Sequence, residues 1–196
     1  MSQFEYVMVL ISIIIGIAIA HLLLGVGGII DRLAGKREKL ELSVAHAAWM
    51  VATFGWLILF WWWQFRLTAL VEVWTVQQYF FLVLYAVTLF LVCVVLVPRS
   101  WDGVSSLKEY FLERRVWFYG LCVIGGIIDV ADAYLKGGVD YIAALGPMSL
   151  SLMITSTVVA ILGMKIRNIM YHNIAAITIM LWQYLVGFDA FPRLAF

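Results

Sequence analysis

Charged residues are scarce in this sequence of 196 residues. Aspartate, glutamate, lysine and arginine together make up 13% of it, about half the share found in soluble domains. The formal net charge is +1 and no long block of lysine and arginine occurs, so the composition argues against nucleic acid as a partner. Because 65% of the residues are hydrophobic, we predict that a lipid bilayer is the solvent for most of the surface.

Cysteine and catalytic motifs are nearly absent as well. The two cysteines, Cys93 and Cys122, both fall in apolar runs, where a thiol is usually a small hydrophobic group. No disulfide framework is therefore predicted. The sequence contains no GxSxG, HExxH or phosphate-binding loop motif. We expect neither an enzyme nor a resident cofactor.

The sequence is rich in long apolar runs. A helix of about 20 residues crosses a hydrocarbon core roughly 30 Å thick, and six runs are long enough to do so. None shows the alternation of apolar and polar residues that membrane-spanning strands require. The predicted fold is therefore all-α, a single polytopic transmembrane helical bundle. Its predicted spans are residues 7–30, 44–64, 77–97, 116–135, 141–163 and 173–191.

Positive charge is distributed unevenly between the two sides of this bundle. Ten of the 13 lysines and arginines fall in the first, third and fifth loops, and cytoplasmic loops carry such an excess. We therefore expect these three loops in the cytoplasm and both termini outside, as in a bacterial inner-membrane protein. The remaining three basic residues are Arg66, Lys136 and Arg193.

The third loop has a helical pattern of its own. Ser106 followed by Glu109 is typical of a capping box at the start of a helix. The apolar side chains of Leu107 and Phe111 then lie on one face. The sequence predicts a short interfacial helix over about 105–114 that leads into the fourth span.

Tryptophan is concentrated at the end of the second span, which reads WLILFWWWQF. Indole rings favour the headgroup layer because they combine an apolar body with a polar N–H group. We interpret this cluster as membrane anchors at the outer surface and not as a ligand-binding cage.

The strongest functional signal is the stretch GGIIDVADAYLKGG in the fourth span. Asp129 and Asp132 are three residues apart and share a helical face, and Lys136 is placed to pair with Asp132. Asp129 has no such partner in its own helix. A charged side chain at membrane depth is costly and commonly marks a path for a substrate or an ion. Both aspartates, together with Asp189 late in the sixth span, are therefore transport candidates.

The fifth span is rich in hydroxyl groups. Ser149 and Ser156 share one helical face, and Ser151 and Thr155 share another. Pro147 predicts a kink in the outer half of this helix, because proline removes a backbone donor. Hydroxyl groups at membrane depth can line a pore, or they can join helices through hydrogen bonds. The sequence leaves both roles open.

Small residues mark two faces for close helix packing. Ser12, Gly16 and Ala20 recur every four residues in the first span, and Gly125 and Gly126 precede the aspartates of the fourth. Such patterns let two helices approach closely. The partner helix could belong to this chain, to a second copy in a homo-oligomer, or to another membrane subunit.

The three histidines are weak candidates for binding a metal ion or haem. Imidazole binds haem iron, zinc and copper, but no HxxxH or His–Cys spacing supports a metal ion. His46 and His172 fall near the inner headgroups, while His21 lies closer to the midplane of its span. We expect His21 to bond to a neighbouring helix.

Three functions are compatible with these features. The leading hypothesis is a channel or transporter for a small solute or cation, with Asp129 as the intramembrane acid. The alternative is a non-catalytic accessory subunit of a membrane complex, whose polar residues serve helix contacts only. The second alternative is a redox module that binds haem or quinone through the histidines.

Overall fold

The protein is all-helical in a computed structural model that describes residues 3–35, 40–65, 67 and 74–190, without the side chains of 189 and 190. No strand occurs among these residues, and six of their helices are long and apolar enough to cross a membrane. The all-α prediction with six spans is therefore confirmed at the level of length and composition. The helices are α1 (Gln3–Ala34), α2 (Val44–Gln64), α4 (Val76–Leu96), α5 (Leu107–Ala144), α6 (Gly146–Lys165) and α7 (Ile169–Ala190).

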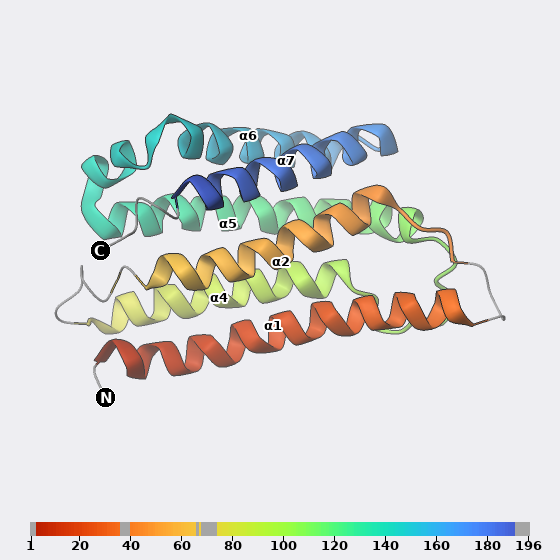
Figure 1. The fold of residues 1–196 in the computed structure, drawn as a ribbon, viewed down its shortest axis with the longest axis horizontal. Helices are drawn as coiled ribbons and strands as arrows, with labels where there is room; N and C mark the ends of the chain where they lie inside the picture. Colours follow the sequence, from red (N-terminus) through yellow and green to blue (C-terminus); the bar gives the residue numbers. More distant parts are fainter. Residues whose placement is uncertain (1–2, 36–39, 66, 68–73, 191–196) are drawn as a thin grey trace.

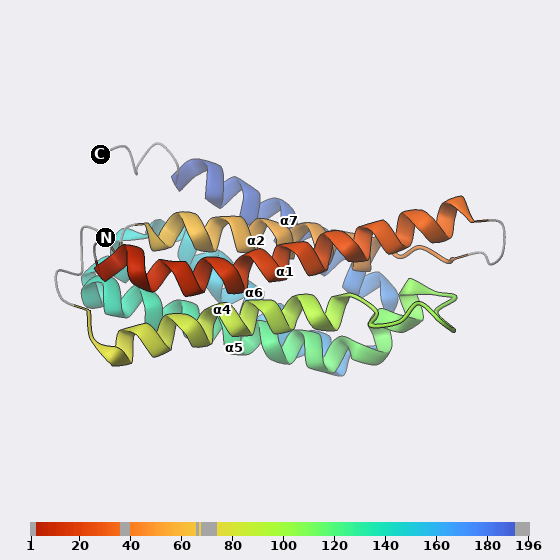
Figure 2. The ribbon, with the colours of Figure 1, turned by 90° about the horizontal axis from the view of Figure 1, so that it is seen from below.

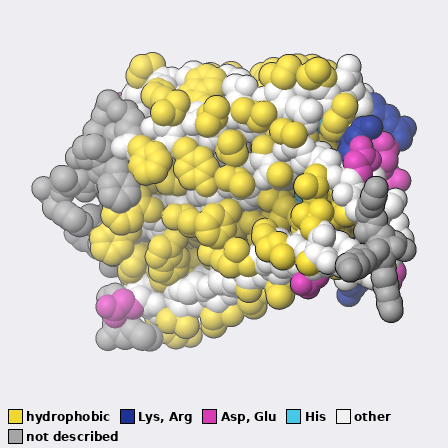
Figure 3. Space-filling model, turned by 45° about the vertical axis from the view of Figure 1, so that its right-hand side comes forward, with side chains coloured by type: hydrophobic (Ala, Val, Ile, Leu, Met, Phe, Trp, Pro, Cys, Tyr) yellow, Lys and Arg dark blue, Asp and Glu magenta, His cyan; other side chains and the backbone are white. Residues whose placement is uncertain are grey.

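Successive helices run in opposite directions (Figure 1). The N-terminal end of α1 and the C-terminal end of α7 lie on the same side of the bundle, where α2 ends and α4 begins. The C-terminal ends of α1, α4 and α6 lie on the second, opposite side. Figure 3 shows that lysine and arginine side chains gather toward this second side, while the face in view is otherwise largely apolar. The alternation matches an even number of membrane crossings.

The helices form a closed ring in the order α1, α4, α5, α6, α7 and α2. Helix α2 also contacts α4 and α5 across the ring, so α2 and α5 belong to two four-helix groups. We call the group of α1, α2, α4 and α5 the packed half, and the group of α2, α5, α6 and α7 the cavity half. Figures 1 and 2 together show α1 and α4 on one flank of the shared helices and α6 and α7 on the other.

Large buried side chains lie mainly in the packed half. Tyr85 of α4, Phe60 of α2 and Ile11 of α1 are each at most 1% exposed. In α6, by contrast, only Ala160 and Gly163 are buried. The core that holds the bundle together therefore lies between α1, α2, α4 and α5, and α6 is attached at its edge.

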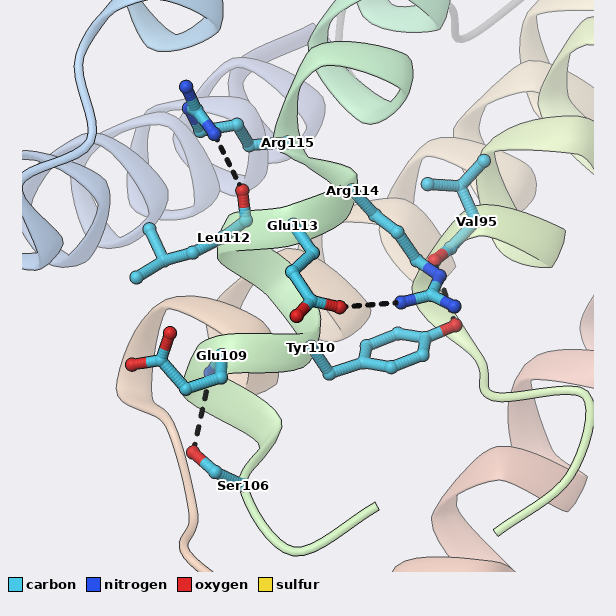
Figure 4. Close-up of polar contacts among 8 residues, drawn as sticks. All are labelled: Val95, Ser106, Glu109, Tyr110, Leu112, Glu113, Arg114 and Arg115. Carbon is cyan, nitrogen blue, oxygen red and sulfur yellow. Dashed lines mark hydrogen bonds and ion pairs between the residues drawn. The ribbon is translucent and has the colours of Figure 1, made fainter. Parts of the chain in front are cut away.

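The first turns of α5 form the segment predicted as an interfacial helix. Ser106 caps the helix, since its Oγ accepts a hydrogen bond from the Glu109 backbone N–H group at 3.3 Å (Figure 4). The helix then continues into the membrane span without a break, so the segment is not a separate element. The Ser106 hydroxyl also donates to a Glu41 carboxylate oxygen at 2.5 Å. This contact ties the start of α5 to the segment that precedes α2.

Charged side chains near this end of α5 are held by local contacts. The Tyr110 hydroxyl donates to the Val95 carbonyl of α4 at 3.2 Å, and the Arg114 guanidinium carbon lies 4.0 Å from the centre of the Tyr110 ring. Arg114 also pairs with Glu113 at 3.7 Å, as Figure 4 shows. Because both partners of that pair are largely exposed, it contributes little stability.

The connection between α5 and α6 differs from the predicted one. Gly137 and Gly138 interrupt the helix within α5, and Gly138 has a φ of 66°, which glycine adopts without strain. Gly146, with a φ of 82°, starts α6, and Pro147 occupies its first turn. Proline fits there because the first backbone N–H groups of a helix lack intrahelical partners. The predicted kink at Pro147 is therefore wrong, and residues 141–144 of the predicted fifth span belong to α5.

Candidate functional site

A partly open cavity of about 250 Å³ lies in the cavity half, lined by side chains of α2, α5, α6 and α7. Its volume is close to the lower end of the range for small-molecule sites, roughly 300 to 1,000 Å³. Four residues selected from the sequence line it together, namely Asp129, Asp132, Ser149 and Ser156. The fold thus brings two carboxylates of α5 and two hydroxyls of α6 to one space within the bundle.

Asp129 has a partner that its own helix does not provide. The hydroxyl of Tyr85, on α4, donates a hydrogen bond to Asp129 Oδ1. Tyr85 is 1% exposed and packs against Phe60 of α2, with 4.8 Å between the ring centres. The phenol therefore approaches Asp129 from the packed half, while the carboxylate also lines the cavity. Asp129 lies at the boundary between the two halves.

Asp132 and Lys136 form the ion pair that their spacing predicts. The Lys136 Nζ atom lies 2.5 Å from Asp132 Oδ2, and the two side chains are 3% and 11% exposed, respectively. Both residues line the cavity. The pair is therefore buried inside the bundle. Removing one member of such a pair leaves an uncompensated buried charge.

Two contacts show which residues of α2 and α5 lie at the same level. The ring centres of Trp49 and Phe118 are 5.0 Å apart, and a Cβ atom on Gly125 would lie 2.6 Å from Cη2 of Trp56. Helices α2 and α5 run in the same direction, and in both contacts the residue number on α5 exceeds that on α2 by 69. The same offset places Trp63 at the level of Asp132. Trp56 and Trp63 both line the cavity.

The level of α6 follows in the same way. Gly163 approaches the Tyr119 ring, and Gly126 lies near the Thr157 hydroxyl, where an added Cβ atom would be 3.2 Å away. Since α6 is antiparallel to α5, Ser156 lies near the level of Gly126, and Ser149 lies near the level of the Asp132–Lys136 pair. The Ser156 hydroxyl donates to the Met153 carbonyl at 3.1 Å.

The cavity has a charged end and an apolar end. The side chains of Asp129, Asp132 and Lys136 lie toward the end of the cavity where α1 begins and α7 ends, and Ser149 is at their level. From Lys136 to Phe118 is about 27 Å along α5, at 1.5 Å per residue. The lining at the far end is formed by Trp49, Phe118, Cys122, Ala160 and Ile179. The chemical character of the lining thus changes along the bundle axis.

The other transport candidates do not join this group. Ser151 and Thr155 are absent from the lining, and the Ser151 hydroxyl donates to the Met148 carbonyl at 2.9 Å. Asp189 lies in the last turn of α7, where side chains fall outside the part of the chain that the structure describes. The hydroxyl face of Ser149 and Ser156 therefore faces the cavity, and the face of Ser151 and Thr155 does not.

The histidines lie at separate places with separate partners. His172 is fully buried; its Nδ1 lies 2.9 Å from the Tyr119 hydroxyl and its Nε2 lies 3.0 Å from the Ile166 carbonyl. His46 Nε2 lies 2.8 Å from the Leu96 carbonyl, and His21 packs edge-on against Phe90. Among the described residues, no three His, Cys, Asp or Glu side chains are grouped to hold a metal ion.

The small residues fall into two groups, one packed within the chain and one on its outer face. Gly125 allows Trp56 of α2 to approach α5, and Gly126 lies against Thr157 of α6. Ser12, Gly16 and Ala20 are exposed on the outer face of α1, and a Cβ atom on Gly16 would meet nothing within 4 Å. The α5 glycines thus pack within the chain, whereas the α1 ridge faces outward.

Several lining residues carry no functional signal in the sequence. Gln183 of α7 lines the cavity and donates to the Ala52 carbonyl at 3.1 Å. Trp63 lines the cavity as well, while Trp61 and Trp62 are 44% and 38% exposed. The tryptophan cluster therefore has two faces, and the interpretation of the whole cluster as anchors does not describe Trp63. Helical spacing around Trp56 could have separated the two faces.

Comparison with known proteins gives no relative. No family model matches the chain, and no curated protein and no solved structure matches it. The site is thus defined by its chemistry, which combines two carboxylates, one ammonium group, hydroxyls and indoles around one cavity.

Proposed function

We propose that the protein is a membrane transporter that binds a small solute, by preference a cation, in the cavity of α2, α5, α6 and α7. One observation carries this proposal: Asp129 and Asp132 both line a single cavity of about 250 Å³ within the helical bundle. Placing a charged carboxylate at membrane depth costs about 2.5 to 3.5 kcal/mol on insertion scales. Such groups commonly lie on the paths of ions and substrates.

The charge balance of the lining supports a cationic solute. Lys136 pairs with Asp132 at 2.5 Å, whereas the hydrogen-bond partner of Asp129 is the neutral phenol of Tyr85. The lining thus contains two carboxylates and one ammonium group, and that ammonium group pairs with Asp132. Since opposite charges attract strongly where water is excluded, a cation that enters the cavity is stabilised next to Asp129.

The same proposal includes an orientation. The first, third and fifth loops face the cytoplasm of a bacterial cell and both termini face outward, so the charged end of the cavity lies in the outer half of the inner membrane. The gathering of basic side chains at one end of the bundle supports this assignment (Figure 3). Single cysteines placed in the third and fourth loops of a variant without native cysteines test it. An impermeant reagent added outside should label the fourth loop alone.

The transport proposal is tested by flux into proteoliposomes. We expect uptake of at least one of Na⁺, K⁺, H⁺ and tetramethylammonium, and Asp129→Asn should reduce it at least ten-fold, because the variant removes the unpaired negative charge. The matched control is Asp140→Asn, an exposed acid on the same helix that is not part of the lining. Equal fluxes in the wild type and Asp129→Asn would contradict the proposal and favour an accessory subunit.

A further inference from the structure

Aromatic rings also line the charged part of the cavity. Trp63 lies at the level of Asp132, Trp56 lies about one helical turn from Asp129, and Tyr141 is part of the same lining. An organic cation is attracted to the faces of such rings as well as to a carboxylate. A small hydrated metal ion instead needs several oxygen ligands, and no group of three His, Cys, Asp or Glu side chains occurs among the described residues.

Among the described residues, none with a charged side chain lines the rest of the cavity. From Asp129 to Phe118 the cavity extends about 16 Å along α5, past Ser156, Gln183 and Cys122, and its far end is lined by apolar side chains that include Ala160. Burying apolar ligand surface there yields roughly 25 cal/mol per Å². A ligand that fills both parts therefore needs a positive head and an apolar body.

We propose that the ligand of this cavity is an amphipathic organic cation, with its head between Asp129 and the indole of Trp63 and its apolar body directed toward Phe118. The proposal deepens the proposed function, since it assigns a substrate class to that cavity, and it rests on the cavity being the binding site. Lys136 does not oppose such a head, because its own charge is neutralised by Asp132 at 2.5 Å.

Three probes separate the contributions of charge and apolar surface. Benzyltrimethylammonium carries both, tetramethylammonium carries only the charge, and neopentylbenzene is the uncharged isostere of the first. Equilibrium dialysis against the purified protein in lipid nanodiscs, corrected with empty nanodiscs, measures their binding. We expect benzyltrimethylammonium to bind at least ten-fold more tightly than either other probe. Equal binding of the first two probes, or of the first and third, would overturn the proposal on the wild-type protein alone.

Two pairs of variants then test where the cationic head of the ligand binds. Asp129→Asn should weaken benzyltrimethylammonium binding at least ten-fold, while Asp140→Asn leaves it unchanged. Trp63→Leu should weaken it about five-fold, as expected for a cation–π contact of about 1 kcal/mol, whereas Trp61→Leu, at an exposed neighbour outside the lining, should not. Unchanged binding in both Asp129→Asn and Trp63→Leu would place the head elsewhere and reject the assignment.

Failure of this ligand assignment can be distinguished from failure of the transport proposal. If benzyltrimethylammonium does not bind but an inorganic cation enters proteoliposomes in an Asp129-dependent manner, the substrate class is wrong and the transport function stands. If benzyltrimethylammonium binds as expected but no cation, including this one, is taken up, the ligand assignment stands and the transport function is wrong.

Discussion

The packed half and the cavity half share α2 and α5 but differ in how their remaining helices are used. In their most apolar windows, α4 is 44% buried and α6 only 11%. Helices α1 and α4 are also more apolar than α6 and α7. The more apolar pair fills its space with large side chains, whereas the more polar pair encloses a space that protein atoms leave open. As pairs, α1 and α4 are 33% and 44% buried in these windows, against 11% and 28% for α6 and α7.

This difference has an energetic meaning. A close-packed interior gains dispersion energy from every contact, and a cavity loses the contacts of the side chains that line it. The packed half can therefore tolerate little change in volume. The cavity half should accept additional volume, whether from a larger side chain or from a ligand.

The largest expected effect concerns the charged end of the cavity. Lys136→Met leaves the buried Asp132 carboxylate without its ammonium partner, and breaking such a pair typically costs about 3–5 kcal/mol. Thermal unfolding in detergent measures the loss. The double variant Lys136→Met with Asp132→Asn removes both charges and should recover most of it. A double variant as unstable as the single one would show that packing, and not charge, dominates at this position.

A pair of leucine substitutions compares the two halves directly. Ala86 is fully buried on α4, so Ala86→Leu should cost about 1–3 kcal/mol through overpacking. Ser156 lines the cavity, so Ser156→Leu should be tolerated and should compete with ligands for the same space. Thermal stability and benzyltrimethylammonium binding check the two expectations. Equal losses of stability would mean that the cavity half is as intolerant of added volume as the packed half.

The boundary between the halves is tested by Tyr85→Phe. This change removes the hydroxyl that donates to Asp129 while keeping the ring that packs against Phe60. We expect a stability loss of about 1–2 kcal/mol, because a buried acceptor loses its donor. Tyr110→Phe, which also removes one hydroxyl donor to a neighbouring segment, is a control far from the cavity. Altered cation binding in Tyr85→Phe but not in Tyr110→Phe would show that a residue of the packed half influences the site.

The smallest expected effect is on the outer face of α1. Gly16→Ala adds a methyl group where nothing lies within 4 Å and should stabilise the helix by about 0.5–1 kcal/mol. Gly25→Ala, whose Cβ atom would lie 2.6 Å from a Val97 methyl group, should instead destabilise the packed half. Unfolding of both variants in detergent measures the difference. Destabilisation by Gly16→Ala would mean that this face is covered by another helix.

Local spacing was sufficient to predict much of this architecture. The apolar runs predicted the six helices, a spacing of four predicted the Asp132–Lys136 pair, and a spacing of seven placed Ser149 and Ser156 on one face. Each of these features depends on the period of a single helix. The sequence therefore contains them without reference to any other segment.

Features that depend on neighbouring helices could not be predicted. The partner of Asp129 is Tyr85, which is 44 residues away on another helix. Proline allows either a kink or a helix start, and only the positive φ of Gly146 decides between them for Pro147. The role of Trp63 depends on the level at which α2 meets α5. In each case the deciding information is how one helix is placed against another.

The two free cysteines provide a separate chemical reporter for each half. Cys93 is fully buried in the packed half, whereas Cys122 is partly accessible and lines the cavity. Methylmercury should therefore react with one thiol per native molecule, and with both only after unfolding. An occupant of the cavity would slow the first reaction by covering Cys122, and would affect the second only by stabilising the native state. The native chain can thus be titrated for occupancy and for folding in the same sample, without an engineered label.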